Sequence, residues 1–226
     1  GLIEVSNSHD ITFDHVEIRN DDYHAGFYQY NGYNIRLLGS YIHDNGVPGV
    51  NLDNGIYWDQ TAGGGNLIAN CLIEHNVANG LSLYASASPS EPTQVTVEEN
   101  TVVNNGHYGI DVYGGQNVIV NNILSGNGSA YNSQQLTVAT GTNHIIDSNI
   151  MWSTTVSHQG VYNQTGQVIT NTIIADPLFA NPSSHDYHLL IGSPAIGVGN
   201  PSYQQPVDKD GVTRGPSDLG AYEFVP

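Results

Sequence analysis

The chain has 226 residues and a formal net charge of −17 at pH 7, and its only lysine and arginine residues are Arg19, Arg36, Lys209 and Arg214. This charge argues against nucleic acid as a partner, and a polyanionic polysaccharide would need a bridging cation such as calcium. Because no apolar run reaches about 18 residues, the sequence predicts no membrane insertion.

From the N-terminus to residue 176, one asparagine-flanked corner recurs every 22 to 30 residues. The clearest copies lie within residues 97–128, where Asn100 and Asn122 are each followed five residues later by another asparagine. The first corner position is occupied in turn by His15, Ser40, Asn70, Asn100, Asn122, Asn149 and Asn171. The second corner position is occupied by Asn20, Asn45, His75, Asn105, Asn127, Thr154 and Asp176. The residue that opens the next strand is Gly26, Gly55, Gly80, Gly109, Gln135 and Gly160 in successive coils.

A constant corner with variable spacing indicates stacked coils of β-structure, about seven here, with loops inserted between corners. One coil cannot bury its apolar side alone, so like residues stack about 4.8 Å apart, aliphatic side chains in dry columns and asparagines in ladders. The alternative, a β-sandwich with Asn-rich turns, would not repeat one corner seven times. The predicted inward columns are Phe27, Ile56, Leu81, Ile110, Leu136 and Val161, and Leu37, Leu67, Val97, Ile119, Ile146 and Val168.

The repeating unit N-x-x-x-x-N…G-I-x-V resembles the right-handed parallel β-helix repeat of pectate-lyase-like proteins. The resemblance covers residues 1–176 and implies an all-β fold, a single-stranded right-handed parallel β-helix. It leaves the activity open, because this fold carries lyases, hydrolases, epimerases, phage tailspikes and adhesins.

At Asp176 the repeat ends, and residues 177–226 form a different segment. Its DPLF…DYHL…SPAIG…DKDG…R…SDLGAYE pattern is similar to the C-terminal part of bacterial secreted β-helix proteins. Since the open end of a β-helix is an unpaired sheet edge, we expect this irregular tail to cap it, with residues 189–191 and 221–224 as the covering pieces. Arg214 is predicted to pair with Asp218.

Three long loops, residues 46–54, 60–66 and 85–93, cluster on coils two to four, where insertions usually build a binding face. The single cysteine, Cys71, is expected to be a small buried hydrophobe. A surface rich in Asn, Gly, Ser, Thr and Tyr and poor in Lys favours a secreted, extracellular or cell-surface protein. The start of the chain in a strand-like segment, without a signal peptide, suggests a mature or excised piece.

Residues that alternate with the inward column should point outward. The two outward columns read Glu4, Tyr28, Tyr57, Ser82, Asp111, Thr137 and Tyr162, and Ser6, Tyr30, Asp59, Tyr84, Tyr113, Ala139 and Gln164. Five tyrosines of coils two to five therefore share one face, namely Tyr28, Tyr30, Tyr57, Tyr84 and Tyr113. Aromatic rings pack against sugar faces, so this face is a predicted carbohydrate-binding surface, although tyrosine also suits exposed strands for structural reasons.

Asp59 and Asp111 stand on the same face and are the candidate catalytic pair. As the acid and base of an inverting glycosidase, their carboxyl groups would need to lie roughly 6.5–9.5 Å apart; the alternative is two solvated carboxylates. The Asp-Asp pair and Gly-His-Gly motif expected of β-helix polygalacturonases are missing. A lyase would need a Lys or Arg base, and this face has none. His24 and His107 precede its strands and are the alternative bases. If the protein is an enzyme, the sequence therefore favours a glycoside hydrolase over a polysaccharide lyase.

Four aspartates, Asp21, Asp22, Asp44 and Asp53, fall near one corner of adjacent coils. Carboxylate oxygens on stacked turns suit Ca²⁺, so these residues are predicted as a calcium site that stabilises the fold.

Together these features predict an extracellular β-helix that binds polysaccharide through its tyrosine face, either with or without processing it. The alternative is a non-catalytic subunit of a filament or surface fibre. Nothing precedes the column headed by Ile3 and Val5, so this end could pair with another chain, and end-to-end contacts of this kind do not close. In that case the protein would self-associate at micromolar concentration, and Ile3→Asp would break the assembly.

Overall fold

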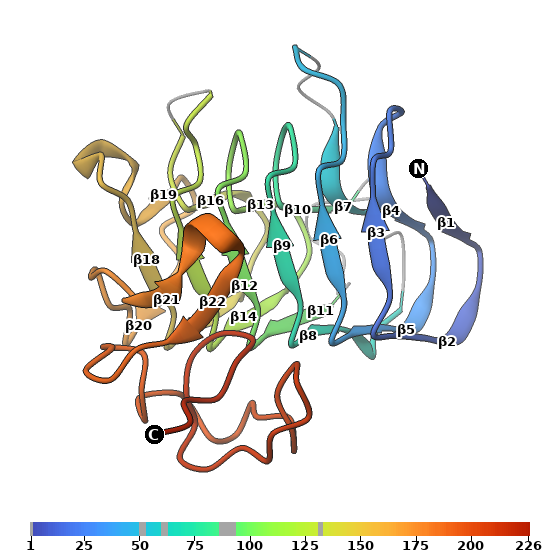
Figure 1. The fold of residues 1–226 in the computed structure, drawn as a ribbon. Helices are drawn as coiled ribbons and strands as arrows, with labels where there is room; N and C mark the ends of the chain where they lie inside the picture. The colour runs from blue at the N-terminus through green and yellow to red at the C-terminus, as the bar shows by residue number, and fades with distance from the viewer. Residues whose placement is uncertain (1, 50–52, 60–62, 86–93, 131–132) are drawn as a thin grey trace.

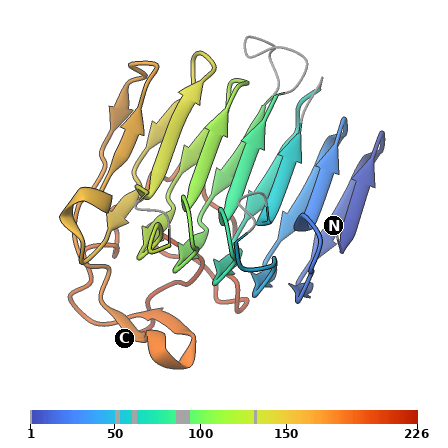
Figure 2. The same cartoon turned by 90° about the horizontal axis from the view of Figure 1, so that it is seen from above.

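The computed structural model describes residues 2–49, 53–59, 63–85, 94–130 and 133–226, and these form a parallel β-helix with a C-terminal segment along its side (Figure 1). Three parallel sheets run the length of the helix. The first two contain seven strands and the third contains six, which agrees with the predicted stack of about seven coils. Each of the first six coils contributes one strand to each sheet, and the seventh contributes to the first two only. Figure 2 shows successive coils lying side by side in chain order.

Sheet A consists of β1 (Ile3–Ser6), β4 (Ala25–Tyr30), β7 (Asn54–Asp59), β10 (Leu81–Tyr84), β13 (Ile110–Tyr113), β16 (Leu136–Thr140) and β19 (Val161–Asn163). Sheet B consists of β2 (His9–Asp14), β5 (Tyr33–Leu38), β8 (Asn66–Ala69), β11 (Val95–Glu98), β14 (Val118–Val120), β17 (Ile145–Asp147) and β20 (Ile169–Thr170). Sheet C consists of β3 (Glu17–Arg19), β6 (Tyr41–His43), β9 (Leu72–Glu74), β12 (Thr101–Val103), β15 (Ile123–Ser125) and β18 (Ile150–Trp152).

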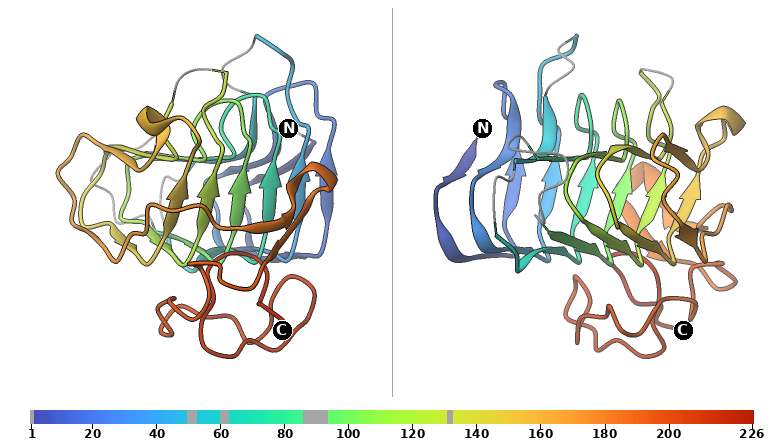
Figure 3. Two further views of the ribbon diagram at one scale, coloured as in Figure 1. Left: turned by 60° about the vertical axis from the view of Figure 1, so that its left-hand side comes forward. Right: turned by 180° about the vertical axis from the view of Figure 1, so that it is seen from behind.

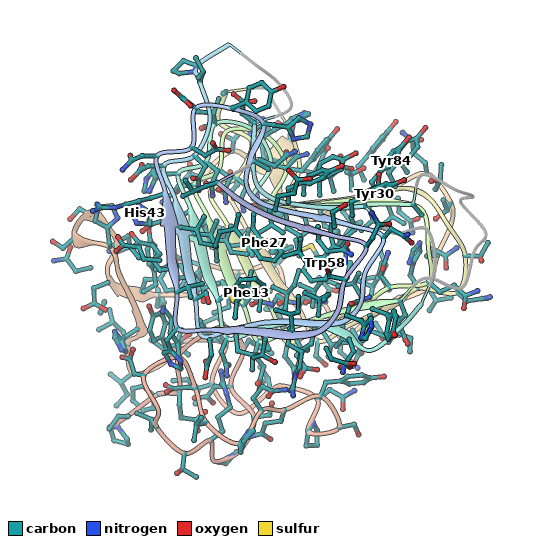
Figure 4. The ribbon with its side chains drawn as sticks, turned by 90° about the vertical axis from the view of Figure 1, so that its right-hand side faces the viewer. Phe13, Phe27, Tyr30, His43, Trp58 and Tyr84 are labelled. Atoms are coloured by element: carbon teal, nitrogen blue, oxygen red, sulfur yellow. The ribbon has the colours of Figure 1, made fainter. Side chains whose placement is uncertain are left out.

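The core is a set of stacked columns inside the coils. The column predicted for sheet A is confirmed, because Phe27, Ile56, Leu81, Ile110, Leu136 and Val161 are register partners. The column predicted for sheet B is wrong at two coils: Ile68 and Ile169 point inward, whereas Leu67 is half-buried and Val168 is exposed. Figure 4 shows Phe13, Phe27 and Trp58 inside the coils and Tyr30 and Tyr84 outside.

Two buried asparagine ladders connect the coils at their corners. In one, Asn100 donates to Asn122 and Asn122 donates to Asn149, each at 3.0 Å. The other runs through Asn45, Asn76, Asn105 and Asn127 at 2.9 Å per step. Five predicted ladder members are wrong by one residue, because each has a left-handed backbone and lies just before the ladder position: His15, Asn20, Asn70, His75 and Asn171. At two of these corners, Cys71 and Asn76 occupy the ladders.

The C-terminal segment does not cap the end of the β-helix as expected. The antiparallel strands β21 (Phe179–Asn181) and β22 (Asp186–Leu189) lie against the outer face of sheet C, where Tyr187 packs on Leu72 and Val103 (Figures 1 and 3). The remainder follows the corner between sheets B and C, because Lys209 Nζ donates to the Gly39 carbonyl at 2.7 Å and Asn200 Nδ2 to Asp147 at 2.9 Å.

Arg214 fastens this segment, but through partners other than the predicted Asp218 carboxylate. Its guanidinium lies 3.3 Å from Glu99 and donates to Asn70 Oδ1 at 2.7 Å. The Asp218 carboxylate instead accepts from the backbone N–H groups of Gly197 and Phe224. Arg214 therefore holds the segment to the β-helix itself.

Candidate functional site

The outer face of sheet A carries the two outward columns in nearly the predicted register. Tyr28 is paired with Tyr57, Tyr57 with Ser82, and Ser82 with Asp111. The second column differs at one place, where Tyr113 lies opposite Thr140 instead of Ala139, because the register shifts after Val112. The bordering loops contain residues 50–52, 60–62 and 86–93, which lie outside the described residues.

Four of the five tyrosines form a continuous run of ring contacts across four coils. The ring centroids are 5.6 Å apart for Tyr28 and Tyr57, 6.2 Å for Tyr57 and Tyr84, and 5.2 Å for Tyr84 and Tyr113. The first and last of these pairs are stacked, with interplanar angles of 19° and 15°. Tyr113 is 43% exposed and the other three are partly exposed, so ring surface and phenol edges face solvent.

His24 closes one end of this run from the corner before β4. Its ring meets Tyr28 and Tyr57 edge-on, with centroids 5.6 and 5.4 Å away. Glu4, Tyr23, His24 and Tyr28 together line a hollow of about 190 Å³. A polar group therefore lies beside aromatic surface, as in sites that fix the orientation of a sugar ring.

The phenol groups of Tyr28 and Tyr57 remain protonated over the physiological range. Burial raises the pKa of Tyr57 far above its usual value, and the Asp59 carboxylate adds to the shift. Burial and Asp59 also raise the pKa of Tyr28. These hydroxyls can consequently both donate and accept hydrogen bonds with a ligand.

Asp111 is a carboxyl group on this face whose acidity is shifted by its surroundings. Burial raises its pKa to about 6, and a weak hydrogen bond from Asn79 Nδ2 at 3.4 Å only partly offsets this effect. Asn79 is itself oriented by the Tyr108 backbone N–H, which donates to Asn79 Oδ1 at 3.0 Å. A carboxyl group with this pKa is partly protonated in weakly acidic solution and can act as a general acid.

Asp59 and Asp111 share the face but occupy different columns. Asp59 is buried in register with Tyr30 and Tyr84, whereas Asp111 follows Tyr57 and Ser82. Two strands and two residues separate them, which corresponds to about 12 Å between their backbones. Their action as a catalytic pair stays a prediction, and it requires the two side chains to lean toward each other.

The four predicted calcium ligands do not come together among the described residues. The Asp21 backbone N–H donates to Asn45 Oδ1, so Asp21 stands at the end of an asparagine ladder. Asp53 Oδ2 accepts from the Val47 N–H at 2.7 Å, and Asp44 Oδ2 lies 2.8 Å from His43 Nδ1, while Asp22 is exposed. Over the described part of the chain, the group with ligand atoms close enough for one metal ion is Glu74, His75 and His185.

Sequence reasoning missed this histidine group because its members are distant in the chain. Glu74 is the last residue of β9 and His75 follows it, whereas His185 precedes β22. The adjacent pair Glu74–His75 is the only local signal, and nothing in the repeat indicates which tail residue meets it.

None of the four lysine and arginine residues lies on sheet A, all of whose strands are described. Arg19 lies 3.3 Å from Glu17 on sheet C, Arg36 belongs to β5 of sheet B, and Lys209 and Arg214 belong to the tail. In the described residues, no helix is long and apolar enough to span a membrane.

Residues 1–150 match the family described as "Right handed beta helix region", so the chain belongs to this family of right-handed parallel β-helix proteins. It is similar to "Pectate lyase L" of Paenibacillus polymyxa (strain SC2), with 29% identity over 140 residues, which is 62% of this chain and 28% of that protein. The fold is similar to that of pectate lyase Pel9A, with a TM-score of 0.55 and 16% identity over 98% of this chain and 70% of that chain.

Proposed function

We propose that the tyrosine face of sheet A, formed by Tyr28, Tyr30, Tyr57, Tyr84 and Tyr113, binds a neutral or weakly charged polysaccharide outside the cell. The observation that carries this proposal is the unbroken run of ring contacts from Tyr28 to Tyr113. Because four coils place their ends about 14 Å apart, the run matches an extended chain better than a single sugar.

The likeness to Pectate lyase L supports a polysaccharide as the ligand, and it gives no support to a filament subunit. The chain spans only 28% of that relative, so the activity of the relative is not transferred to it. With a net charge of −17 and no basic residue on sheet A, a neutral glycan fits this face better than a polyanion.

The test is binding to a panel of neutral and acidic polysaccharides by wild-type protein and Tyr57→Ala. Loss of one central ring should weaken binding about tenfold. Tyr33→Ala is the matched control, because Tyr33 is 46% exposed but stacks on His9 over sheet B. No binding by the wild type, or equal effects of the two variants, would refute the proposal.

Processing of the bound chain is a separate claim, in which Asp111 acts as the acid and Asp59 as the base. Release of reducing ends should then occur with the wild type and be lost in Asp111→Asn, with binding retained. If the wild type binds a glycan and releases no reducing ends, the face is a binding surface only.

A further inference from the structure

Two imidazoles and one carboxylate meet where the tail contacts sheet C. His75 Nδ1 lies 2.8 Å from Glu74 Oε2, and His185 Nδ1 lies 2.9 Å from Glu74 Oε1. The three ligand atoms all lie within 4.8 Å of one another. The two rings are inclined by 77° with centroids 5.5 Å apart, and each directs its Nδ1 toward the same carboxylate.

The carboxylate is held in place by groups outside this trio. The Tyr187 hydroxyl donates to Glu74 Oε2 at 2.5 Å, and the Tyr41 hydroxyl donates to Oε1. Asn104 Nδ2 in turn donates to the Tyr187 hydroxyl at 3.2 Å. The side chain of Glu74 is fully buried. Ligands whose orientation is fixed by hydrogen bonds from neighbouring groups are characteristic of metal sites.

We infer that Glu74, His75 and His185 form a Zn²⁺ site that fastens the tail to the β-helix. Two imidazole nitrogens and one carboxylate oxygen are a ligand set that Zn²⁺ prefers, whereas Ca²⁺ takes six to eight oxygens. The histidine side chains are 40% and 55% exposed, so water can supply the fourth ligand.

The rearrangement needed for binding is small. A tetrahedral ion with bonds of about 2.0–2.1 Å separates its ligand atoms by about 3.3 Å. The two imidazoles lie 2.8 and 2.9 Å from different oxygens of Glu74, so the imidazole beside the oxygen that binds the ion must move away from it by about 0.4–0.5 Å. The other pairs of ligand atoms, which lie within 4.8 Å of one another, must adjust to the same separation. Each Nδ1 must also be free of its proton, which the neutral imidazole then carries on Nε2.

Both histidines can be replaced with little change to the backbone. His75 and His185 have φ values of 52° and 60°, a left-handed conformation that asparagine adopts readily. The variants His75→Asn and His185→Asn therefore remove a ligand while keeping a residue suited to the corner.

The experiment is calorimetric titration of ZnCl₂ into the tag-free, chelator-treated 226-residue protein. Wild type should bind one ion with a micromolar or lower Kd and unfold at a higher temperature with Zn²⁺, but not with millimolar Ca²⁺. Each asparagine variant should bind more than about tenfold more weakly. The control is His188→Asn, since His188 also bonds carboxylates of the tail, Asp186 and Asp210, through opposite ring nitrogens.

The absorption of the Co²⁺-loaded protein supplies a second readout, with the visible bands of a four-coordinate site in wild type and His188→Asn only. Circular dichroism of the metal-free variants establishes that they are folded. No saturable Zn²⁺ binding by the wild type, or equal Zn²⁺ affinity in folded His75→Asn and His185→Asn, would overturn the inference.

Discussion

Glycine opens four of the coils because an asparagine of the following corner needs the space. A Cβ atom at Gly26, Gly55, Gly80 or Gly109 would lie 2.5–2.8 Å from the side chain of a ladder asparagine, and none of these glycines has a positive φ. Where Gln135 stands at this position, its own amide joins the ladder and accepts from Asn127 Nδ2 at 2.8 Å. The asparagine and glycine of the repeat are therefore two parts of one packing arrangement.

Asp111 should make the stability of the protein depend on pH. Between about pH 4 and 6, the unfolded chain has lost the proton of this carboxyl group and the folded chain retains it, because burial raises the folded pKa to about 6. Rising pH therefore lowers the free energy of unfolding over this window, by up to about 3 kcal/mol. Urea unfolding at pH 4 and 7 should show that Asp111→Asn lacks this contribution.

A residue with the opposite shift provides the control for this measurement. The hydrogen bond from His188 lowers the pKa of Asp186, so its contribution is present above pH 4 and is lost as the pH falls. Below about pH 4, the wild type should therefore lose stability as the pH falls, and Asp186→Asn should lack this loss. Parallel pH profiles for wild type and Asp111→Asn would contradict the assignment of a raised pKa.

At the scale of the repeating element, Cys71 imitates an asparagine. Its thiol contacts the carbonyl oxygens of Leu37 and Ala69 at 3.5 and 3.3 Å. One coil further on, Asn100 Nδ2 donates to the equivalent carbonyls of Ile68 and Glu98, at 2.9 and 3.0 Å. The thiol is fully buried, and burial raises its pKa to about 12, so it remains a neutral, weak donor.

We expect Cys71→Asn to extend the ladder by one coil and to stabilise the fold by about 0.5–1.5 kcal/mol, because an amide replaces a weak thiol donor. Cys71→Val should be destabilising, since the same carbonyls then lose their donor. The test is the unfolding temperature of each variant compared with that of the wild type. A Cys71→Asn protein that unfolds below the wild type would show that the corner cannot accept the amide.

The same corner explains which parts of the fold could be predicted from the sequence. Stacking repeats the inward and outward alternation of sheet A, so its columns follow from the spacing of glycines. Asparagine, however, has two uses at a corner, because it forms ladders and also tolerates the left-handed backbone of the residue before them. The sequence therefore predicts Asn70 at the position that Cys71 occupies, and Leu67 at the position that Ile68 occupies.

The contacts of the tail could not be predicted, because they join residues far apart in the chain through side chains that follow no repeat. Glu74 meets His185 across 111 positions, and Arg214 meets Asn70 across 144. Charge complementarity alone pointed to Asp218, which is near in sequence but uses its carboxylate to bind backbone N–H groups.

At the scale of the whole molecule, we expect that Arg214 is required to keep the tail attached to the β-helix. Replacement by methionine leaves the buried Glu99 carboxylate without its cation, at a cost of about 3–5 kcal/mol. Hydrogen exchange of residues 195–224 should accelerate accordingly. Arg19→Met is the control, because Arg19 and Glu17 are 55% and 52% exposed and such a pair contributes about 1 kcal/mol at most. Equal exchange in both variants would assign the attachment to other contacts.

The path of the tail also affects how the protein unfolds. A solenoid whose coils touch only their neighbours can fray from either end, one coil at a time. Here His15 of the first coil bonds the Lys209 carbonyl at 3.0 Å, Asn121 bonds the Tyr203 carbonyl at 2.7 Å, and Asp147 near the far end bonds Asn200. The tail thus contacts coils along most of the stack, so the opening of a terminal coil also breaks contacts of the tail with other coils. We therefore expect the β-helix to unfold in one cooperative, all-or-none step, as a globular domain does.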